Sequence, residues 1–307
     1  MTSVVDHSAQ TGYSDPGRLA ELFDAVPPTI EGVSAMARNL VVHYRASGRE
    51  LPEHSRDDIA LRWVEAILDV DRARHDLPLT AERPIEQRVQ GCCRDHSLLA
   101  VSALRHHGVA ARSRVGFTSY ILPTWHHDHV IVEAWIGGRW RRFDPEFESP
   151  VPALPDPTDI EPWPADRFMT AAQVWLEHRQ GRLDVSRFGV DEGLGLDGEW
   201  FVHCYVIGEV AHRFGDELLL WDDWGMMYFG DAEPADGPSL PERHELTDRV
   251  ARLLVEADGE DLDAERELLA LYRIDDRLHP GRLIRSISPN GGVDRIDLEA
   301  RTRQRLT

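Results

Sequence analysis

The sequence has few cysteines, a deficit of basic residues relative to acidic ones, and no long apolar run. Its 307 residues include three cysteines, and 34 Lys and Arg stand against 54 Asp and Glu. Three cysteines, two of them adjacent, are too few for a disulfide framework or a structural zinc site. An acidic surface repels phosphate backbones and anionic lipids, so we expect neither nucleic-acid nor membrane binding.

Targeting features are also lacking. The first 15 residues are polar and have neither the basic region nor the apolar region of a signal peptide. No apolar run approaches the ~18–20 residues that span a bilayer. We therefore expect a cytoplasmic protein whose thiols stay reduced.

The order of patterns along the chain predicts an α+β fold. Helical apolar spacing occurs before residue 75 and again after 169, while residues 109–143 alternate as strands do. Six prolines mark one surface loop or linker. We expect the following organisation: a flexible tail (1–15), a core with N-terminal helices (16–148), a Pro-rich linker (149–168) and a mainly helical C-terminal extension (169–307).

Cys92 and Cys93 directly precede a short apolar helix that Gly108 is expected to end. A helix N-terminus carries unpaired N–H groups and about half a positive charge. These features favour a thiolate and can stabilise an oxyanion, so a cysteine there is a candidate nucleophile. The alternative is that both cysteines are small buried hydrophobic residues, as most free cysteines are.

The stretch from His126 to Pro145 predicts a β-hairpin that turns at Gly137-Gly138. A two-residue loop pairs Ile136 with Arg139 and Glu133 with Arg142. His129 and Asp144 then become diagonal neighbours on one face, about 7–8 Å apart along the backbone. A thiolate needs a base and the base needs an orienting group, so this pair is a candidate to serve the cysteine.

The segment from Gly91 to Pro145 resembles the core of the transglutaminase-like superfamily. Its pieces occur in the family's order: Gly91-Cys92-Cys93-Arg94-Asp95, Gly108-Val109-Ala110-Ala111-Arg112, His129 with Glu133, Trp140, and Asp144-Pro145. The resemblance implies a papain-like catalytic triad of Cys93, His129 and Asp144, with Cys93 rather than Cys92 as the nucleophile. It also implies a helix that carries the cysteine and an antiparallel sheet that carries the other two residues.

The implied triad predicts two pKa shifts and one oxyanion donor. His129 and the helix N-terminus should lower the pKa of Cys93, and Asp144 should raise that of His129. Gln87 lies six residues before Cys93, the spacing of the oxyanion Gln in papain-like proteases. It is a possible oxyanion donor or, alternatively, an exposed polar residue.

The function we expect is thiol-dependent acyl transfer on a peptide or amide through a Cys93 thioester. Release to water would make the protein a peptidase or amidase, and release to an amine would make it a cross-linking enzyme or an amide synthase. We expect no cofactor and no metal. The alternatives are a non-catalytic binding module of the same fold and, more remotely, a metal-dependent hydrolase that uses the histidines of 126–129.

Overall fold

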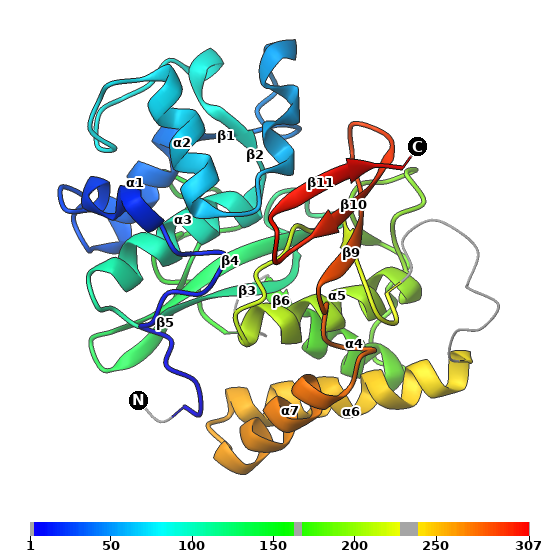
Figure 1. The fold of residues 1–307 in the computed structure, drawn as a ribbon. Helices are drawn as coiled ribbons and strands as arrows, with labels where there is room; N and C mark the ends of the chain where they lie inside the picture. The colour runs from blue at the N-terminus through cyan, green and yellow to red at the C-terminus, as the bar shows by residue number, and fades with distance from the viewer. Residues whose placement is uncertain (1–2, 163–167, 228–238, 307) are drawn as a thin grey trace.

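The computed structural model describes residues 3–162, 168–227 and 239–306 (Figure 1). Helices and an antiparallel sheet combine in it, which confirms the α+β class. The α-helices are α1 (Ile30–Leu40), α2 (Val64–Arg74), α3 (Cys93–His106), α4 (Ala171–Arg179), α5 (Glu199–Arg213), α6 (Leu240–Asp258) and α7 (Leu262–Ile274). The 3₁₀ segments are η1 (Gly17–Phe23), η2 (Glu53–Ala60) and η3 (Ile85–Gln87).

The strands form three sheets. Their bounds are β1 (Val41–His43), β2 (Val89–Gly91), β3 (Ala111–Thr118), β4 (His126–Ile136), β5 (Arg139–Phe143), β6 (Phe168–Thr170), β7 (Phe188–Gly189), β8 (Asp222–Asp223), β9 (Leu283–Ile287), β10 (Val293–Asp297) and β11 (Thr302–Arg305). The central sheet has the order β5-β4-β3-β6, and β7 pairs with β4. In Figure 1 it lies between the N-terminal helices and the helices α4–α7.

The β4–β5 hairpin has the predicted register. Ile136 pairs with Arg139 and Glu133 pairs with Arg142. Gly137 and Gly138 have φ values of 65° and 82°, which is the left-handed backbone that a tight hairpin turn needs. Extended by one residue past β5, this register places Asp144 on the same face of the sheet as His129.

Another glycine, Gly116, lets the strands beside His129 approach closely. Gly116 on β3 pairs with His129 on β4 and with Thr170 on β6. A Cβ atom at position 116 would lie 2.1 Å from the Met169 carbonyl oxygen. Only glycine therefore fits where β6 joins the sheet.

Residues 3–15 differ from the flexible tail that we expected. His7, Tyr13 and Ser14 are buried. The Ala111 N–H donates to the His7 carbonyl oxygen at 3.0 Å, and the Ser102 hydroxyl donates to the Ser14 carbonyl oxygen at 2.6 Å. These hydrogen bonds to backbone carbonyl oxygens, together with the buried side chains, attach the segment to α3 and β3.

The segment after residue 168 is continuous with the central core. β6 completes the central sheet, and α5 packs against β3. One hydrophobic cluster runs from Tyr13 to Ile296. The predicted helices α4, α6 and α7 are present, but the sheet of order β11-β10-β9-β8 was not anticipated. In the Pro-rich segment Leu154 and Ile160 are buried, while 163–167 lie outside the described residues.

Glu133 anchors three arginines at the base of the hairpin. Its carboxylate accepts from Arg112 at 2.8 Å, from Arg114 at 3.4 Å and from Arg142 at 2.7 Å. Burial alone would raise the pKa of Glu133, but the three guanidinium groups hold it far below its usual range. Glu133, which lies four residues after His129 in the sequence, therefore stabilises the fold.

Replacing Glu133 with Gln should lower the free energy of unfolding by about 3–5 kcal/mol, because the buried cations lose their counter-charge. Denaturant titration would measure the loss. The exposed Glu245→Gln change is the matched control and should stay within about 0.5 kcal/mol. A depressed carboxyl pKa contributes stability above the unfolded value of ~4.3, so the difference between wild type and Glu133→Gln should persist at neutral pH and shrink as the pH falls below 4. Equal midpoints at pH 7 would contradict this role.

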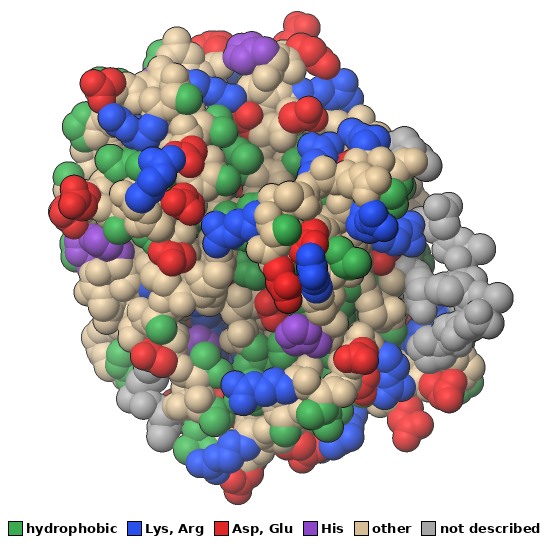
Figure 2. Space-filling view, in the orientation of Figure 1, with side chains coloured by type: hydrophobic (Ala, Val, Ile, Leu, Met, Phe, Trp, Pro, Cys, Tyr) green, Lys and Arg blue, Asp and Glu red, His purple; other side chains and the backbone are tan. Residues whose placement is uncertain are grey.

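The surface carries charges of both signs. Figure 2 shows acidic and basic side chains interspersed over one face of the molecule. Across the described part of the chain, no helix is both long and apolar enough to cross a bilayer.

Candidate functional site

The start of α3 places Cys93 in the interior. Gly91 is required there, because a Cβ atom would lie 2.7 Å from Asp95 Oδ2 and 3.0 Å from a Val41 methyl. Asp95 Oδ2 accepts the Cys92 N–H at 2.8 Å and so caps the helix. Cys93 is the first helical residue, and its N–H is among those without a partner within the helix.

Arg94 and Ser97 hold this helix start against the rest of the protein. The fully buried Arg94 guanidinium donates to Asp95 at 2.8 Å and to the Arg62 carbonyl oxygen at 2.6 Å. The Ser97 hydroxyl donates to the carbonyl oxygen of Val130, the residue after His129, at 2.8 Å. The Gly-x-Cys-Arg-Asp motif thus fixes the position of the thiol relative to β4.

His129 and Asp144 meet as the hairpin register predicted. His129 Nε2 lies 2.7 Å from Asp144 Oδ2, and both residues are 2% exposed. Burial alone would lower the pKa of His129, but the Asp144 carboxylate and its hydrogen bond raise it above the ordinary value. Burial would likewise raise the pKa of Asp144, but His129 lowers it overall. The pair therefore favours an imidazolium beside a carboxylate.

Two further donors hold the Asp144 carboxylate. The Tyr120 hydroxyl donates to Oδ2 at 2.6 Å, and the Glu146 N–H donates to Oδ1 at 3.0 Å. The Tyr120 ring also meets the His129 imidazole edge to face, with centroids 5.8 Å apart. Tyr120 is therefore a positioning residue for the pair, and its sequence context gave no signal of this.

Replacing Tyr120 with Phe should slow acylation of Cys93 about tenfold, a cost of ~1.4 kcal/mol, since a buried charged acceptor loses one donor. The rate of thioester formation from an activated acyl donor, followed by intact mass, would measure it. Unchanged rates would show that the histidine and the backbone donor suffice to position Asp144.

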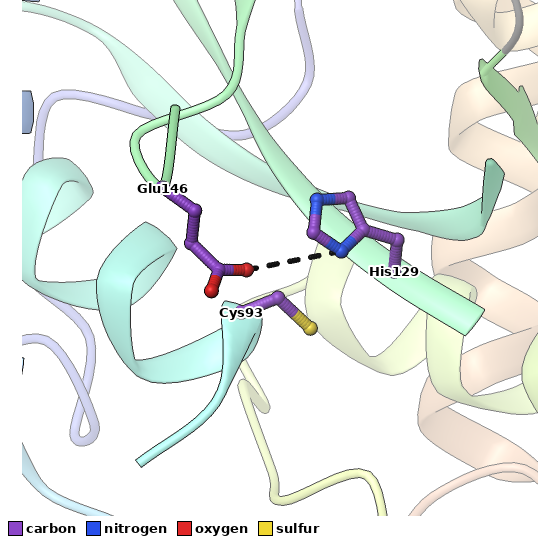
Figure 3. Close-up of side chains that lie close together, drawn as sticks. All are labelled: Cys93, His129 and Glu146. Atoms are coloured by element: carbon purple, nitrogen blue, oxygen red, sulfur yellow. Dashed lines mark ion pairs between the residues drawn. The ribbon is translucent and has the colours of Figure 1, made fainter. Parts of the chain in front are cut away.

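Glu146 joins Cys93 and His129 in a compact cluster (Figure 3). One carboxylate oxygen of Glu146 lies 3.9 Å from His129 Nδ1. The Cys93 Sγ, a ring nitrogen of His129 and a Glu146 oxygen all lie within 4.8 Å of one another. Figure 3 shows the Glu146 carboxylate and the Cys93 sulfur next to the ring nitrogen that the dashed line joins to Glu146. The imidazole thus faces Asp144 with one nitrogen and the thiol and Glu146 with the other.

The thiol differs from our expectation of a lowered pKa. A hydrogen bond with Cys92, burial, and the carboxylates of Glu146 and Asp128 raise the pKa of Cys93 well above its ordinary value. Cys93 is 3% exposed, so water stabilises a thiolate poorly. The expected lowering is therefore wrong for this arrangement, because the sequence pattern accounted for the helix N-terminus but not for the hydrogen bond with Cys92 or for the burial of the thiol.

The structure does not bring Gln87 into the buried site. Its side chain is exposed on η3, which fits the alternative of an exposed polar residue. Gln90 is buried, but its amide donates to the Pro52 carbonyl oxygen and to Ser55. Of the two oxyanion donors that the sequence predicted, Gln87 and the N–H groups at the start of the helix, the structure leaves the Cys93 N–H as the candidate.

The histidines that precede His129 have other partners. The His126 ring stacks on Phe188 with centroids 4.0 Å apart. His127 Nδ1 lies 2.9 Å from the Val190 carbonyl oxygen. Among the residues that the structure describes, the group close enough to hold a metal is Cys93, His129 and Glu146, not the 126–129 run.

Two histidines that we did not single out also border the cluster. His96 Nδ1 lies 3.0 Å from the Cys92 carbonyl oxygen and 3.7 Å from Glu146. His43 Nδ1 accepts the N–H groups of Arg45 and Ala46, so the proton is on Nε2. Only Glu146 had a signal in the sequence, because the hairpin register places it opposite His129.

A comparison of the sequence with protein-family models agrees with the motifs. A family model described as the Transglutaminase-like superfamily matches residues 48–145. A solved structure of a putative cysteine protease from Cytophaga hutchinsonii aligns at 19% identity and a TM-score of 0.29. That alignment covers 46% of this chain and 40% of the other, less than half of each. No curated protein matches. From the family model, residues 48–145 of this chain form a domain of the transglutaminase-like superfamily.

Proposed function

We propose that this protein is a thiol-dependent acyl-transfer enzyme that acts on a peptide or another amide. The observation that carries the proposal is the position of His129. One ring nitrogen lies 2.7 Å from Asp144, and a ring nitrogen lies within 4.8 Å of the Cys93 sulfur. A nucleophile, a base and an orienting carboxylate are the parts that covalent acyl transfer needs.

The chemistry proceeds through a thioester. The reactive form has a neutral His129 imidazole: the Cys93 proton passes to it as the sulfur attacks the amide carbonyl carbon, and the oxyanion accepts a hydrogen bond from the Cys93 N–H. The C–N bond breaks, and His129 returns the proton to the departing amine. Water or an amine then gives a proton to His129 and attacks the thioester, the C–S bond breaks, and the proton returns to the thiol.

Intact-mass analysis would test this proposal. Chelator-treated protein is incubated with peptides, simple amides and acyl thioesters, then quenched in acid. We expect a mass increase equal to the acyl group, which peptide mapping should assign to Cys93 and which hydroxylamine should remove. If no donor labels Cys93, a non-catalytic binding module should replace this proposal.

Glu146 should affect the pH at which the Cys93 thiol ionises and becomes reactive. Its carboxylate raises the pKa of Cys93 and also that of His129, so Glu146→Gln should lower both. Alkylation of Cys93 by iodoacetamide in chelator should then begin at lower pH and be faster at pH 7. Glu148→Gln is the matched control, because Glu148 is exposed and lies two residues away. Coincident profiles for the two variants would contradict this role.

A further inference from the structure

Cys93, His129 and Glu146 bring together three different metal-binding groups. A thiol, an imidazole and a carboxylate lie within 4.8 Å of one another, and the residues are buried or half-buried. Thiolate and imidazole are preferred ligands of Zn²⁺, and carboxylate is its third common ligand. We propose that these three side chains form a binding site for a single zinc-like divalent cation that competes with the nucleophilic use of Cys93.

The distances suit a tetrahedral ion after small side-chain rotations. Metal–ligand bonds of about 2.0–2.3 Å place neighbouring ligand atoms about 3.3–3.6 Å apart. His129 Nδ1 and the Glu146 oxygen are 3.9 Å apart, and the sulfur completes the triangle within 4.8 Å. Three protein ligands leave the fourth position for water.

The surroundings already orient two of the three ligands. Asp144 bonds His129 Nε2 at 2.7 Å, which directs the Nδ1 lone pair toward Cys93 and Glu146. A carboxylate behind a metal-binding histidine is a common second layer of zinc sites. His96 lies 3.7 Å from the other oxygen of Glu146, which leaves Oε2 facing His129.

Charge also favours a cation here. Glu146 places a negative charge beside a thiol that must itself become negative to react, which is unfavourable in the free protein. A divalent cation offsets both charges. Binding releases the Cys93 proton to solvent, and the His129 proton where the ring is protonated, so affinity should rise with pH.

The regulatory consequence rests on the proposed function. A bound ion would hold the Cys93 sulfur and the His129 nitrogen that acyl transfer needs, so the metal-loaded protein should form no thioester. Chelation should restore thioester formation. The cation would thus act as a reversible inhibitor and not as a cofactor.

Cobalt(II) is the probe for the test, because a thiolate ligand gives a near-ultraviolet charge-transfer band and tetrahedral geometry gives intense visible bands. Full-length protein at pH 7.5 is titrated with Co²⁺, and Zn²⁺ is then added to displace it. We expect one Co²⁺ per chain with both features. Glu146→Gln should weaken binding at least tenfold, and Cys93→Ser should abolish the charge-transfer band. Glu148→Gln and Cys92→Ser should match the wild type.

A second measurement separates this site from the proposed function. Zn²⁺ should protect Cys93 from iodoacetamide at least tenfold in wild type and in Glu148→Gln, but much less in Glu146→Gln. Co²⁺ spectra or Zn²⁺ protection that are indifferent to Glu146→Gln would overturn the metal site. Thioester formation by the metal-free protein tests only the proposed function. If it fails while Co²⁺ binds as described, the acyl-transfer proposal falls and the metal site stands.

Discussion

Replacing Cys93 with alanine is expected to lower the rate of acyl transfer by a factor on the order of 10⁵–10⁶, because no other group can form the covalent intermediate. The Cys93 sulfur is the nucleophilic atom of the cluster, and it lies within 4.8 Å of a His129 ring nitrogen. Intact mass should show no acyl adduct on the variant. Any rate that remains in the variant would measure only the contributions of substrate binding and of the backbone N–H at position 93.

Cys92→Ala is the matched control, since it removes an adjacent thiol that is equally buried. Cys92 is the N-cap of α3, and its N–H is tied to Asp95. We expect this variant to keep most activity. Its Cys93 should also alkylate at somewhat lower pH, because the hydrogen bond with Cys92 raises the pKa of Cys93. Equal loss of activity in both variants would defeat the assignment of the nucleophile.

Replacing Asp144 with alanine should lower the acylation rate by about 10²–10⁴-fold, because the buried imidazole loses its orienting partner. Asp144 also raises the pKa of His129. Without that carboxylate the imidazolium loses its proton at lower pH. His129 must be unprotonated to take the Cys93 proton, so the acid limb of the pH–rate profile should move to lower pH, and the limbs belong to the coupled pair rather than to single residues.

Asp144→Asn separates orientation from charge. The amide oxygen can still accept the Nε2 hydrogen, but the negative charge is gone. We expect a smaller loss of rate than in Asp144→Ala, with a similar shift of the acid limb. Stopped-flow acylation between pH 5 and 10 would measure both effects. An acid limb that stays at its wild-type pH in both variants would exclude electrostatic support of His129 by Asp144.

Local sequence patterns predicted the geometry of the candidate site where short-range rules govern it. The Gly137-Gly138 turn set the register of β4 and β5, and the register brought His129 to Asp144. The apolar helix that starts at Cys93 was likewise predicted from the sequence, because the spacing of its apolar residues is helical and Gly108 indicates where it ends. These features depend on the backbone preferences of residues that are close together in the chain, and those preferences follow from the residue types.

Other parts of the site depend on contacts between distant segments. Tyr120 reaches Asp144 across 24 positions, and Ser97 binds the Val130 carbonyl oxygen across 33. The sheet that β9 and β10 form near the C-terminus also escaped prediction. No local pattern encodes these pairings, because they arise only when the hydrophobic core brings the segments together.

The sequence by itself determined the family of the domain, the helix that carries Cys93 and the hairpin that pairs His129 with Asp144. The pKa of the Cys93 thiol, in contrast, was decided only by the tertiary structure. The hydrogen bond with Cys92, burial and, to a smaller extent, the nearby Glu146 carboxylate reverse the lowering that a helix N-terminus would produce, and the pKa of Cys93 is raised. The reason is physical: turn and helix geometry follow from neighbours in the chain, whereas desolvation and charge proximity depend on which distant groups share the same small volume.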